Sequence, residues 1–252
     1  LSKIKAKKSR THTEIMLKNL KVPIKIRKTK NYDYILINGV KKISPLSYNI
    51  PGDISSSAFF LVLTILSKNS ELLIKNININ PSRTGIIEIL KRMGANIRII
   101  NKKIYKGESV GDILVKSSNN LKSINCPTKY NTSAIDEFLV IFLVAAKSKG
   151  ISYFKNLSEL NHKESPRLYW SSKILNLMGV KNIVTNDSIK IYGNPNLKIK
   201  RKIHIKNYLK DHRIFMMSVI AGLTFGGSWK INDKDSIKTS FPSFLKILRK
   251  IC

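Results

Sequence analysis

The sequence predicts an α/β (α+β) protein in which one unit of strands and helices is repeated around a shared core. Three observations support this prediction. Three long apolar segments share one layout, three amphipathic segments interleave with them, and short alternating segments follow both kinds. The predicted unit is therefore strand, helix, strand, helix, strand, strand. Its length of roughly 80 residues is too great for a solenoid repeat.

Each apolar segment is predicted to form a buried helix, followed by a polar turn and a strand. Each begins at an Asp, a residue that favours the position just before the first helical turn. After the turn, apolar and polar residues alternate as they do in strands. The leading residues are Asp53, Asp136 and Asp211, and the strands that follow are expected at 71–76, 151–156 and 228–232.

Each amphipathic segment is predicted to form a helix that begins at an Arg and ends near a Gly or an equivalent break. Strands are expected after the second and third of them, at 96–100 and 182–184. Thr11 and Glu14 fit a capping box at the start of the first. The three Arg residues are Arg10, Arg83 and Arg167.

The composition is strongly basic. The 252 residues include 46 Lys and Arg against 15 Asp and Glu, which gives a net charge of +31. A polyanion partner is one interpretation. However, Lys, Ile and Asn are all abundant, as AT-rich codons would produce. The sequence also has no recognition-helix motif, zinc-finger spacing or basic sheet rich in aromatics. We therefore expect no nucleic-acid partner, and a positive field that attracts small anionic substrates.

Several other classes of protein are excluded. The two cysteines, Cys126 and Cys252, rule out a disulfide scaffold and argue against a zinc site. The longest charge-free apolar runs, 58–66 and 138–146, are far shorter than the roughly 20 residues that a bilayer span needs. The first ten residues are basic, with no apolar core of a signal peptide behind them. We expect a cytoplasmic protein with no membrane contact.

Four polar clusters stand at predicted helix N-termini, where the helix dipole and free backbone N–H groups favour anions. Arg167 and Arg213 can each clamp a phosphate or carboxylate with two hydrogen bonds. Lys163 and Glu164 are adjacent in sequence and are candidates for proton transfer. The clusters cover residues 9–12, 136–137, 163–167 and 211–213.

Each cluster also has a purely structural interpretation. Asp136 fits the N-cap of its helix, which is the commonest role of an Asp at such a position. His12 and His212 can be capping or surface groups, and residues 163–167 can be a solvated loop. The coincidence of four clusters at equivalent repeat positions favours a functional site over four separate accidents.

These clusters belong to a longer set of motifs that resembles the 5-enolpyruvylshikimate-3-phosphate (EPSP) synthase family, the 3-phosphoshikimate 1-carboxyvinyltransferases. The residues at 80–85 and 239–242 are similar to those of the bacterial branch of the family that is often tolerant to glyphosate. The motifs are Ser-Arg-x-His-Thr-Glu at 9–14, Pro-Gly-Asp-x-Ser-Ser at 51–56, Asn-Pro-x-Arg-Thr-Gly at 80–85, Ile-Asp-Glu at 135–137, Lys-Glu-Ser-x-Arg at 163–167, Asp-His-Arg at 211–213 and Thr-Ser-Phe-Pro at 239–242.

The resemblance implies a fold of two lobes, each built from three βαβαββ units. By this comparison residues 1–47 are the end of the N-terminal lobe, and residues 48–252 are nearly all of the C-terminal lobe. The chain then lacks roughly the first two-fifths of a family member, including phosphate-binding Lys, Ser and Arg residues. We expect such an N-terminally truncated fragment to be nearly inactive by itself, because half of a closing site cannot preorganise a transition state.

The resemblance also implies catalytic roles. The enolpyruvyl group of phosphoenolpyruvate is transferred to the 5-hydroxyl of shikimate 3-phosphate, and phosphate is released. Asp136 would bind the shikimate hydroxyls and accept the 5-hydroxyl proton. Glu164 would exchange the proton at the methylene carbon. Lys163 would bind shikimate 3-phosphate and assist proton transfer near the 5-hydroxyl and the departing phosphate. No metal or organic cofactor is implied.

The remaining implied roles are in substrate binding. Arg167 and Arg213 would hold phosphoenolpyruvate, with His212 beside them, and Arg10 would reach the phosphate of shikimate 3-phosphate from the other lobe. Pro166 departs from the family, which usually has Asp there. The family is usually monomeric, so the partners expected are the two small-molecule substrates.

Three alternatives stay open. The first is the sister enolpyruvyl transferase that acts on UDP-N-acetylglucosamine. The residues of the motifs at 163–167 and 211–213 argue against it. The second is a non-catalytic basic RNA-binding α/β protein, and the third is a non-catalytic remnant of the synthase.

Overall fold

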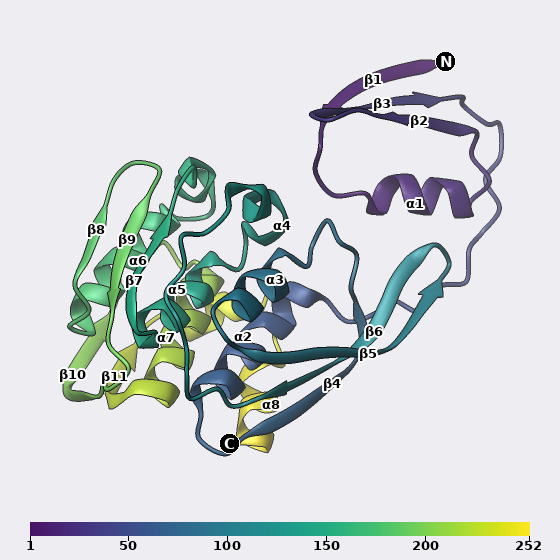
Figure 1. Cartoon of the computed structure of the whole chain (residues 1–252). Coiled ribbons are helices and arrows are strands. Elements are labelled where there is room, and N and C mark those ends of the chain that lie inside the picture. Colours follow the sequence, from purple (N-terminus) through teal and green to yellow (C-terminus); the bar gives the residue numbers. More distant parts are fainter.

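The computed structural model describes residues 1–252, which form a small and a larger body (Figure 1). The small body is a three-stranded antiparallel sheet of order β1-β3-β2 with one helix on the side that faces the larger body. Only two apolar side chains are buried in it, Val22 and Ile35. Its elements are β1 (Ser2–Lys7), α1 (His12–Asn19), β2 (Ile24–Lys28) and β3 (Tyr32–Ile37).

Residues 38–51 have no regular secondary structure and carry the chain from the small body to the larger one. The division expected after residue 47 falls within this stretch. Beyond it, Gly52 forms a parallel bridge with Ile77, and the main hydrophobic core begins at Ile54.

The larger body contains three successive units. The first comprises α2 (Ile54–Leu66), β4 (Glu71–Asn78), α3 (Gly85–Arg92), β5 (Asn96–Tyr105) and β6 (Glu108–Lys116). The second comprises α4 (Asn131–Ala134), α5 (Phe138–Lys147), β7 (Gly150–Phe154), α6 (Arg167–Leu177), β8 (Asn182–Val184) and β9 (Ile189–Gly193). The third comprises β10 (Ile199–Ile205), α7 (His212–Phe225), β11 (Gly226–Ile231) and α8 (Phe244–Ile251).

The strand pairings confirm the repeat predicted from sequence. The sheets β4-β6-β5 and β7-β9-β8 have the same order as β1-β3-β2, with the last strand of each unit in the middle. Short parallel pairings precede the apolar helices, at Gly52 with Ile77, at Asn125 with Tyr153, and between β10 and β11. Each complete unit is therefore a parallel strand pair around an apolar helix, followed by a second helix and two antiparallel strands.

The core of the larger body is built on α2, α5 and α7, which pack against one another. Every residue of α5 from 138 to 146 is buried. Aromatic side chains join the layers: Phe138 and Phe142 both contact Phe154 of β7, and Phe59 packs edge-on against Phe244 of α8. Full burial of one such side chain stabilises the folded state by roughly 1.5–3 kcal/mol. The buried helices therefore hold the residues at their N-termini in fixed positions.

The helix caps agree with the sequence prediction at two of three positions. Asp53 and Asp211 each accept a hydrogen bond from a first-turn backbone N–H, at 2.9 Å from Ser56 and Arg213. Asp136 does not cap its helix. Residues 128–134 already form helical turns, and Glu137, the residue before α5, has helical backbone angles. A capping residue normally has an extended backbone, which lets its side chain reach the N–H groups of the first turn, and no such residue is present here. The carboxylate of Asp136 is thereby free for other partners.

Two further expectations were wrong. The Thr11 side chain makes no capping bond to α1; its hydroxyl instead accepts a hydrogen bond from Asn80 Nδ2 at 3.1 Å. The small sheet also carries the basic and aromatic pattern that the sequence analysis excluded. On its outer face, Lys5 and Arg27 flank Tyr34 from the two neighbouring strands. Strand pairing creates this pattern, because it places Lys5 and Arg27 on either side of Tyr34, to which neither is adjacent in sequence.

No helix of this structure combines the length and the apolar character needed to cross a membrane.

Candidate active site

Side chains from three of the predicted clusters converge on Asp136 of the fourth. Its Oδ2 accepts a 2.5 Å hydrogen bond from Arg10 Nη2, and its Oδ1 lies 3.5 Å from both Lys163 Nζ and Arg167 Nη1. Arg213 Nη1 donates to the backbone oxygen of Asp136 at 2.9 Å. These residues come from the small body, the N-terminal side of α5, the loop before α6, and the first turns of α6 and α7.

More positive than negative charge surrounds the Asp136 carboxylate. Burial raises the pKa of this carboxyl, but the positive charges of Arg213, Lys163 and Arg10 outweigh burial and hold the pKa at about 2. Asp136 is therefore ionised at neutral pH. An anionic ligand that drew cations away from it would raise its pKa and make it a stronger base.

Arg167 is the largest fully buried side chain, with 1% of it exposed. Its Nε donates to Asp211 Oδ2 at 2.9 Å, and its Nη2 bonds to Glu164. Ser165 Oγ also donates to Asp211 Oδ2, at 2.8 Å. Burial raises the pKa of Asp211, but hydrogen bonds and the charge of Arg167 lower it below its usual value. Asp211 thus caps α7 and fixes Arg167 at once.

Pro166 occupies the cap position of α6 and lets Arg167 begin the helix. Its fixed φ is compatible with entry into a helix, and no backbone donor is lost that the first turn could use. The departure from the family motif therefore leaves Arg167 within the site.

The other predicted residues lie at the rim. The side chain of Glu164 is 53% exposed and forms an ion pair with Arg167. Lys163 bridges Asp136 and Glu159, whose Oε1 is 2.9 Å from its Nζ. His212, the first residue of α7, makes no side-chain hydrogen bond; burial and the charge of Arg213 lower its pKa, so its ring is neutral at pH 7.

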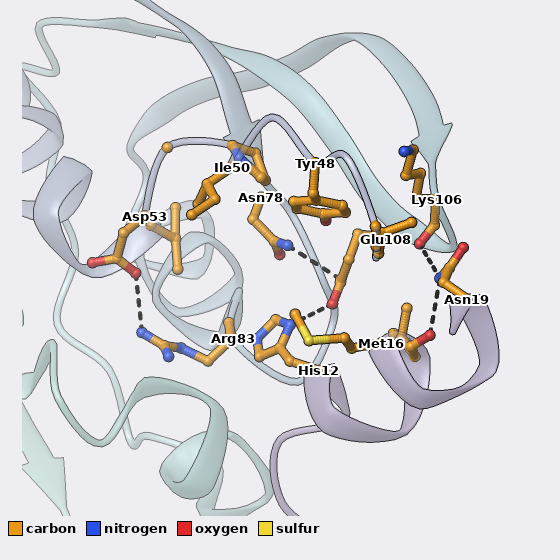
Figure 2. Close-up of a pocket in the computed structure, with 15 residues that line it drawn as sticks. His12, Met16, Asn19, Tyr48, Ile50, Asp53, Asn78, Arg83, Lys106 and Glu108 are labelled. Atoms are coloured by element: carbon orange, nitrogen blue, oxygen red, sulfur yellow. Dashed lines mark hydrogen bonds and ion pairs between the residues drawn. The ribbon is translucent and has the colours of Figure 1, made fainter. Parts of the chain in front are cut away.

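A cavity of about 240 Å³ lies where α1 meets the larger body (Figure 2). His12 and Glu108 line it, and His12 Nδ1 is 2.6 Å from Glu108 Oε1. Asn78, which also lines the cavity, and Asn80, outside the lining, each donate to Glu108 Oε2 at 3.1 Å. Burial raises the pKa of Glu108, but its bonds to His12 and the two amides lower it overall. Sequence reasoning missed Glu108, which lies in a hairpin with no motif around it.

Comparisons with known proteins agree on one family. The family model described as EPSP synthase (3-phosphoshikimate 1-carboxyvinyltransferase) matches residues 1–248. The 3-phosphoshikimate 1-carboxyvinyltransferase of Petrotoga mobilis is 39% identical over 249 residues, which cover 98% of this chain and 56% of that protein. The enzyme of the same name from Thermodesulfovibrio yellowstonii is 39% identical over 251 residues, 97% of this chain and 55% of that protein.

Solved structures give the same result. An EPSP synthase from Acinetobacter baumannii superposes with a TM-score of 0.88 at 32% identity, covering 99% of this chain and 56% of that one. The enolpyruvyl transferase NikO from Streptomyces tendae superposes with a TM-score of 0.73 at 12% identity, covering 99% and 55%, and shows likeness of fold alone. The chain thus spans about half the length of the relatives that it matches.

Proposed function

The chain belongs to the EPSP synthase family, and on this premise we propose that it contributes one half of the site that transfers enolpyruvyl from phosphoenolpyruvate to shikimate 3-phosphate. The observation that supports this most directly is the cluster of Arg10, Lys163, Arg167 and Arg213 around one ionised carboxylate. Such a cluster suits two anionic substrates and an acid–base step between them.

In the proposed reaction, the 5-hydroxyl oxygen of shikimate 3-phosphate bonds to C2 of phosphoenolpyruvate while C3 gains a proton. The hydroxyl proton passes to a base. The tetrahedral adduct then loses a proton from C3 and expels inorganic phosphate, which restores the double bond. Protons balance over the two steps, and no electron acceptor or donor is needed.

Asp136 is proposed as the base for the hydroxyl. In the structure its low pKa would make it a weak base, because three cations stabilise the charged form. The phosphate of shikimate 3-phosphate would compete for Arg10 and Lys163, and phosphoenolpyruvate would compete for Arg213. Substrate binding would therefore raise the pKa of Asp136 when a proton has to be accepted.

Glu164 and Lys163 are proposed for the remaining proton transfers. The carboxylate of Glu164 is exposed, and it is proposed to reach the methylene carbon once it leaves Arg167. Lys163 lies 3.5 Å from Asp136 and is proposed to assist near the hydroxyl and the departing phosphate.

Arg213, Arg167 and His212 are proposed to hold phosphoenolpyruvate. Arg213 has hydrogen-bonding capacity to spare, whereas all of the nitrogens of Arg167 are engaged with carboxylates. For Arg167 to take a substrate carboxylate it must exchange a partner, and exposed Glu164 is the one that can leave. Neutral His212 can then donate a hydrogen bond without adding charge.

The acceptor is proposed to be shikimate 3-phosphate and not a UDP-sugar, because both relatives at 39% identity are named 3-phosphoshikimate 1-carboxyvinyltransferase. We propose that the complete protein is a cytoplasmic monomer with these two substrates as its partners, without metal or organic cofactor. Fixed cations and helix N-termini would stabilise the developing charge.

The test is a chimera in which the part of the Petrotoga mobilis enzyme that this chain does not match precedes Leu1. We expect it to release phosphate from phosphoenolpyruvate only with shikimate 3-phosphate present, and Glu164→Gln to abolish turnover. The 252-residue chain alone should be nearly inert. A folded chimera without turnover overturns the proposal; multiple turnovers by the chain alone overturn the expectation of inertness.

Binding of a single-stranded polyanion such as RNA is a second candidate, favoured by the outer face of the small sheet, where Lys5 and Arg27 flank Tyr34. Aromatic and basic groups together bind unstacked nucleotides. Affinity for a labelled oligouridylate that falls steeply with salt and drops in Tyr34→Ala would support it. Indifference to RNA at physiological salt would exclude it.

A further inference from the structure

A second carboxyl, Glu137, lies directly beside Asp136 and has no role in the proposed reaction. Its side chain is 2% exposed, and its Oε1 accepts a hydrogen bond from Ser55 Oγ in the first turn of α2. The same Oε1 lies 4.0 Å from Arg213 Nη1. A buried carboxyl is costly unless it is paired, so this contact set needs an explanation.

The contacts of Glu137 continue into the first unit. Ser55 Oγ accepts a 2.5 Å hydrogen bond from Arg83 Nη2, and that nitrogen lies 3.3 Å from Asp53 Oδ1. Figure 2 shows the ion pair between Arg83 and Asp53. Glu137 therefore stands between two guanidinium groups, one from the first unit and one from the third.

Arg213 is held only through one nitrogen. Its Nη1 donates to the backbone oxygen of Asp136 at 2.9 Å and faces Glu137, while its other side-chain nitrogens make no hydrogen bond. The free edge of this guanidinium is the part available to an anion. The contacts of Nη1 set the direction of this free edge, because the guanidinium is planar and fixing one end of it orients the opposite edge.

We propose that Glu137 is a positioning residue. It holds Nη1 of Arg213 against the Asp136 backbone, so that the free edge of Arg213 points toward an anionic substrate beside the Asp136 carboxylate. This inference rests on the proposed function for the identity of the anion, phosphoenolpyruvate, but the geometry that it concerns exists without ligand. Ser55 and Arg83 support Glu137 and do not touch the substrate.

Burial and the charge of Asp136 raise the pKa of Glu137 above its usual value, and Arg213, the Ser55 hydroxyl and Arg83 offset this rise only in part. The positioning role therefore rests on the contacts of Glu137 and not on its charge state alone. A side chain that served packing alone would be equally well replaced by an uncharged one of the same shape. A carboxyl that orients a guanidinium is not replaceable in this way, and that difference can be measured.

The experiment compares the wild-type 252-residue chain with Glu137→Gln, which keeps the shape and the Ser55 contact. The primary readout is the NMR resonance of the Arg213 Nε–Hε group, assigned by its loss in Arg213→Lys. We expect the guanidinium signals in Glu137→Gln to shift and to average through faster rotation, with the thermal midpoint nearly unchanged. Calorimetric affinity for phosphoenolpyruvate should fall about tenfold.

Glu71→Gln is the matched control, because it removes one negative charge from an exposed pair with Lys116 at the distant end of α2 and β4. It should change neither readout. Should Glu137→Gln fail to fold, Ser55→Ala removes the support of the same carboxyl without a change of charge and should shift the Arg213 resonance in the same direction.

An unchanged Arg213 resonance in folded Glu137→Gln overturns the inference, whatever happens to affinity. If the wild-type chain itself binds no phosphoenolpyruvate while the Arg213 resonance responds to Glu137→Gln, the positioning role stands and the ligand assignment of the proposed function fails. The two failures are therefore distinguishable.

Discussion

Arg10 and Asp136 are 126 positions apart, and a 2.5 Å hydrogen bond joins them. Arg10 lies two residues before α1 in the small body, whereas Asp136 lies two residues before α5, one of the core helices of the larger body. Any movement of the small body relative to the larger one therefore moves a positive charge toward or away from the carboxylate on which the site is centred.

The first prediction concerns this pair. Arg10→Ala should raise the pKa of Asp136 above its value of about 2, because one of the three cations that stabilise the ionised form is lost. An NMR titration of the Asp136 side-chain carboxyl measures it directly. Arg27→Ala, which removes the same charge from the outer face of the small sheet, is the control. An identical titration in Arg10→Ala and wild type would count against the pairing.

The same shift has a consequence for stability. A carboxyl whose pKa is lower in the folded state than in the unfolded state stabilises the fold above its unfolded pKa. That contribution is lost as the pH falls through the folded value. For Asp136 the window runs from about 4 down to about 2. In Arg10→Ala, the pH range over which this stabilisation is lost should be narrower, and its lower limit should lie at a higher pH.

The second prediction concerns Asp211. Asp211→Asn should destabilise the chain by about 3–5 kcal/mol, since it leaves the buried guanidinium of Arg167 without its main counter-charge. Urea unfolding followed by circular dichroism measures the change. Asp235→Asn breaks an exposed pair with Lys238 and should change nothing measurable. Equal effects of the two substitutions would contradict the assignment of Arg167 and Asp211 as a buried pair.

The third prediction concerns Glu108, the carboxyl that joins α1 to the first unit. Its pKa is lowered in the fold by His12 and two amides, so it stabilises above the unfolded pKa and loses this effect as the pH falls through the folded value. Glu108→Gln should therefore be less stable than wild type at pH 7, and the difference should shrink under acid conditions. Parallel urea titrations at pH 7 and pH 3 measure it; a constant difference would argue that packing alone is involved.

Local signals in the sequence predicted most of the fold. The caps at Asp53 and Asp211 depend on neighbouring residues only, and the order of helices and strands follows from periodicity. Asp136 was misassigned as a cap because its role depends on the helical turn at 128–134, which carries no strong sequence signal. Such a turn is decided by tertiary packing.

The sequence indicated which residues to consider for the candidate site, but not how their side chains contact one another. The resemblance identified Asp136, Lys163 and Arg167, yet nothing in the sequence indicates that Arg167 is fully buried against Asp211. The pairing of His12 with Glu108 depends on how the small body lies against the hairpin of β5 and β6, which is a long-range relationship. Local patterns carry no information about it.

The last prediction uses the two cysteines as probes of the core. Cys126 is buried and burial raises its pKa to about 12, whereas Cys252 is exposed at the end of the chain. Because the thiolate is the reactive form, Cys126 should resist a disulfide reagent at pH 8 while Cys252 reacts at once. We expect one thiol per native chain and two in denaturant. In Cys252→Ser the native chain should show almost none, and rapid reaction of Cys126 there would mean that the packing around residues 121–126 opens far more readily than its burial indicates.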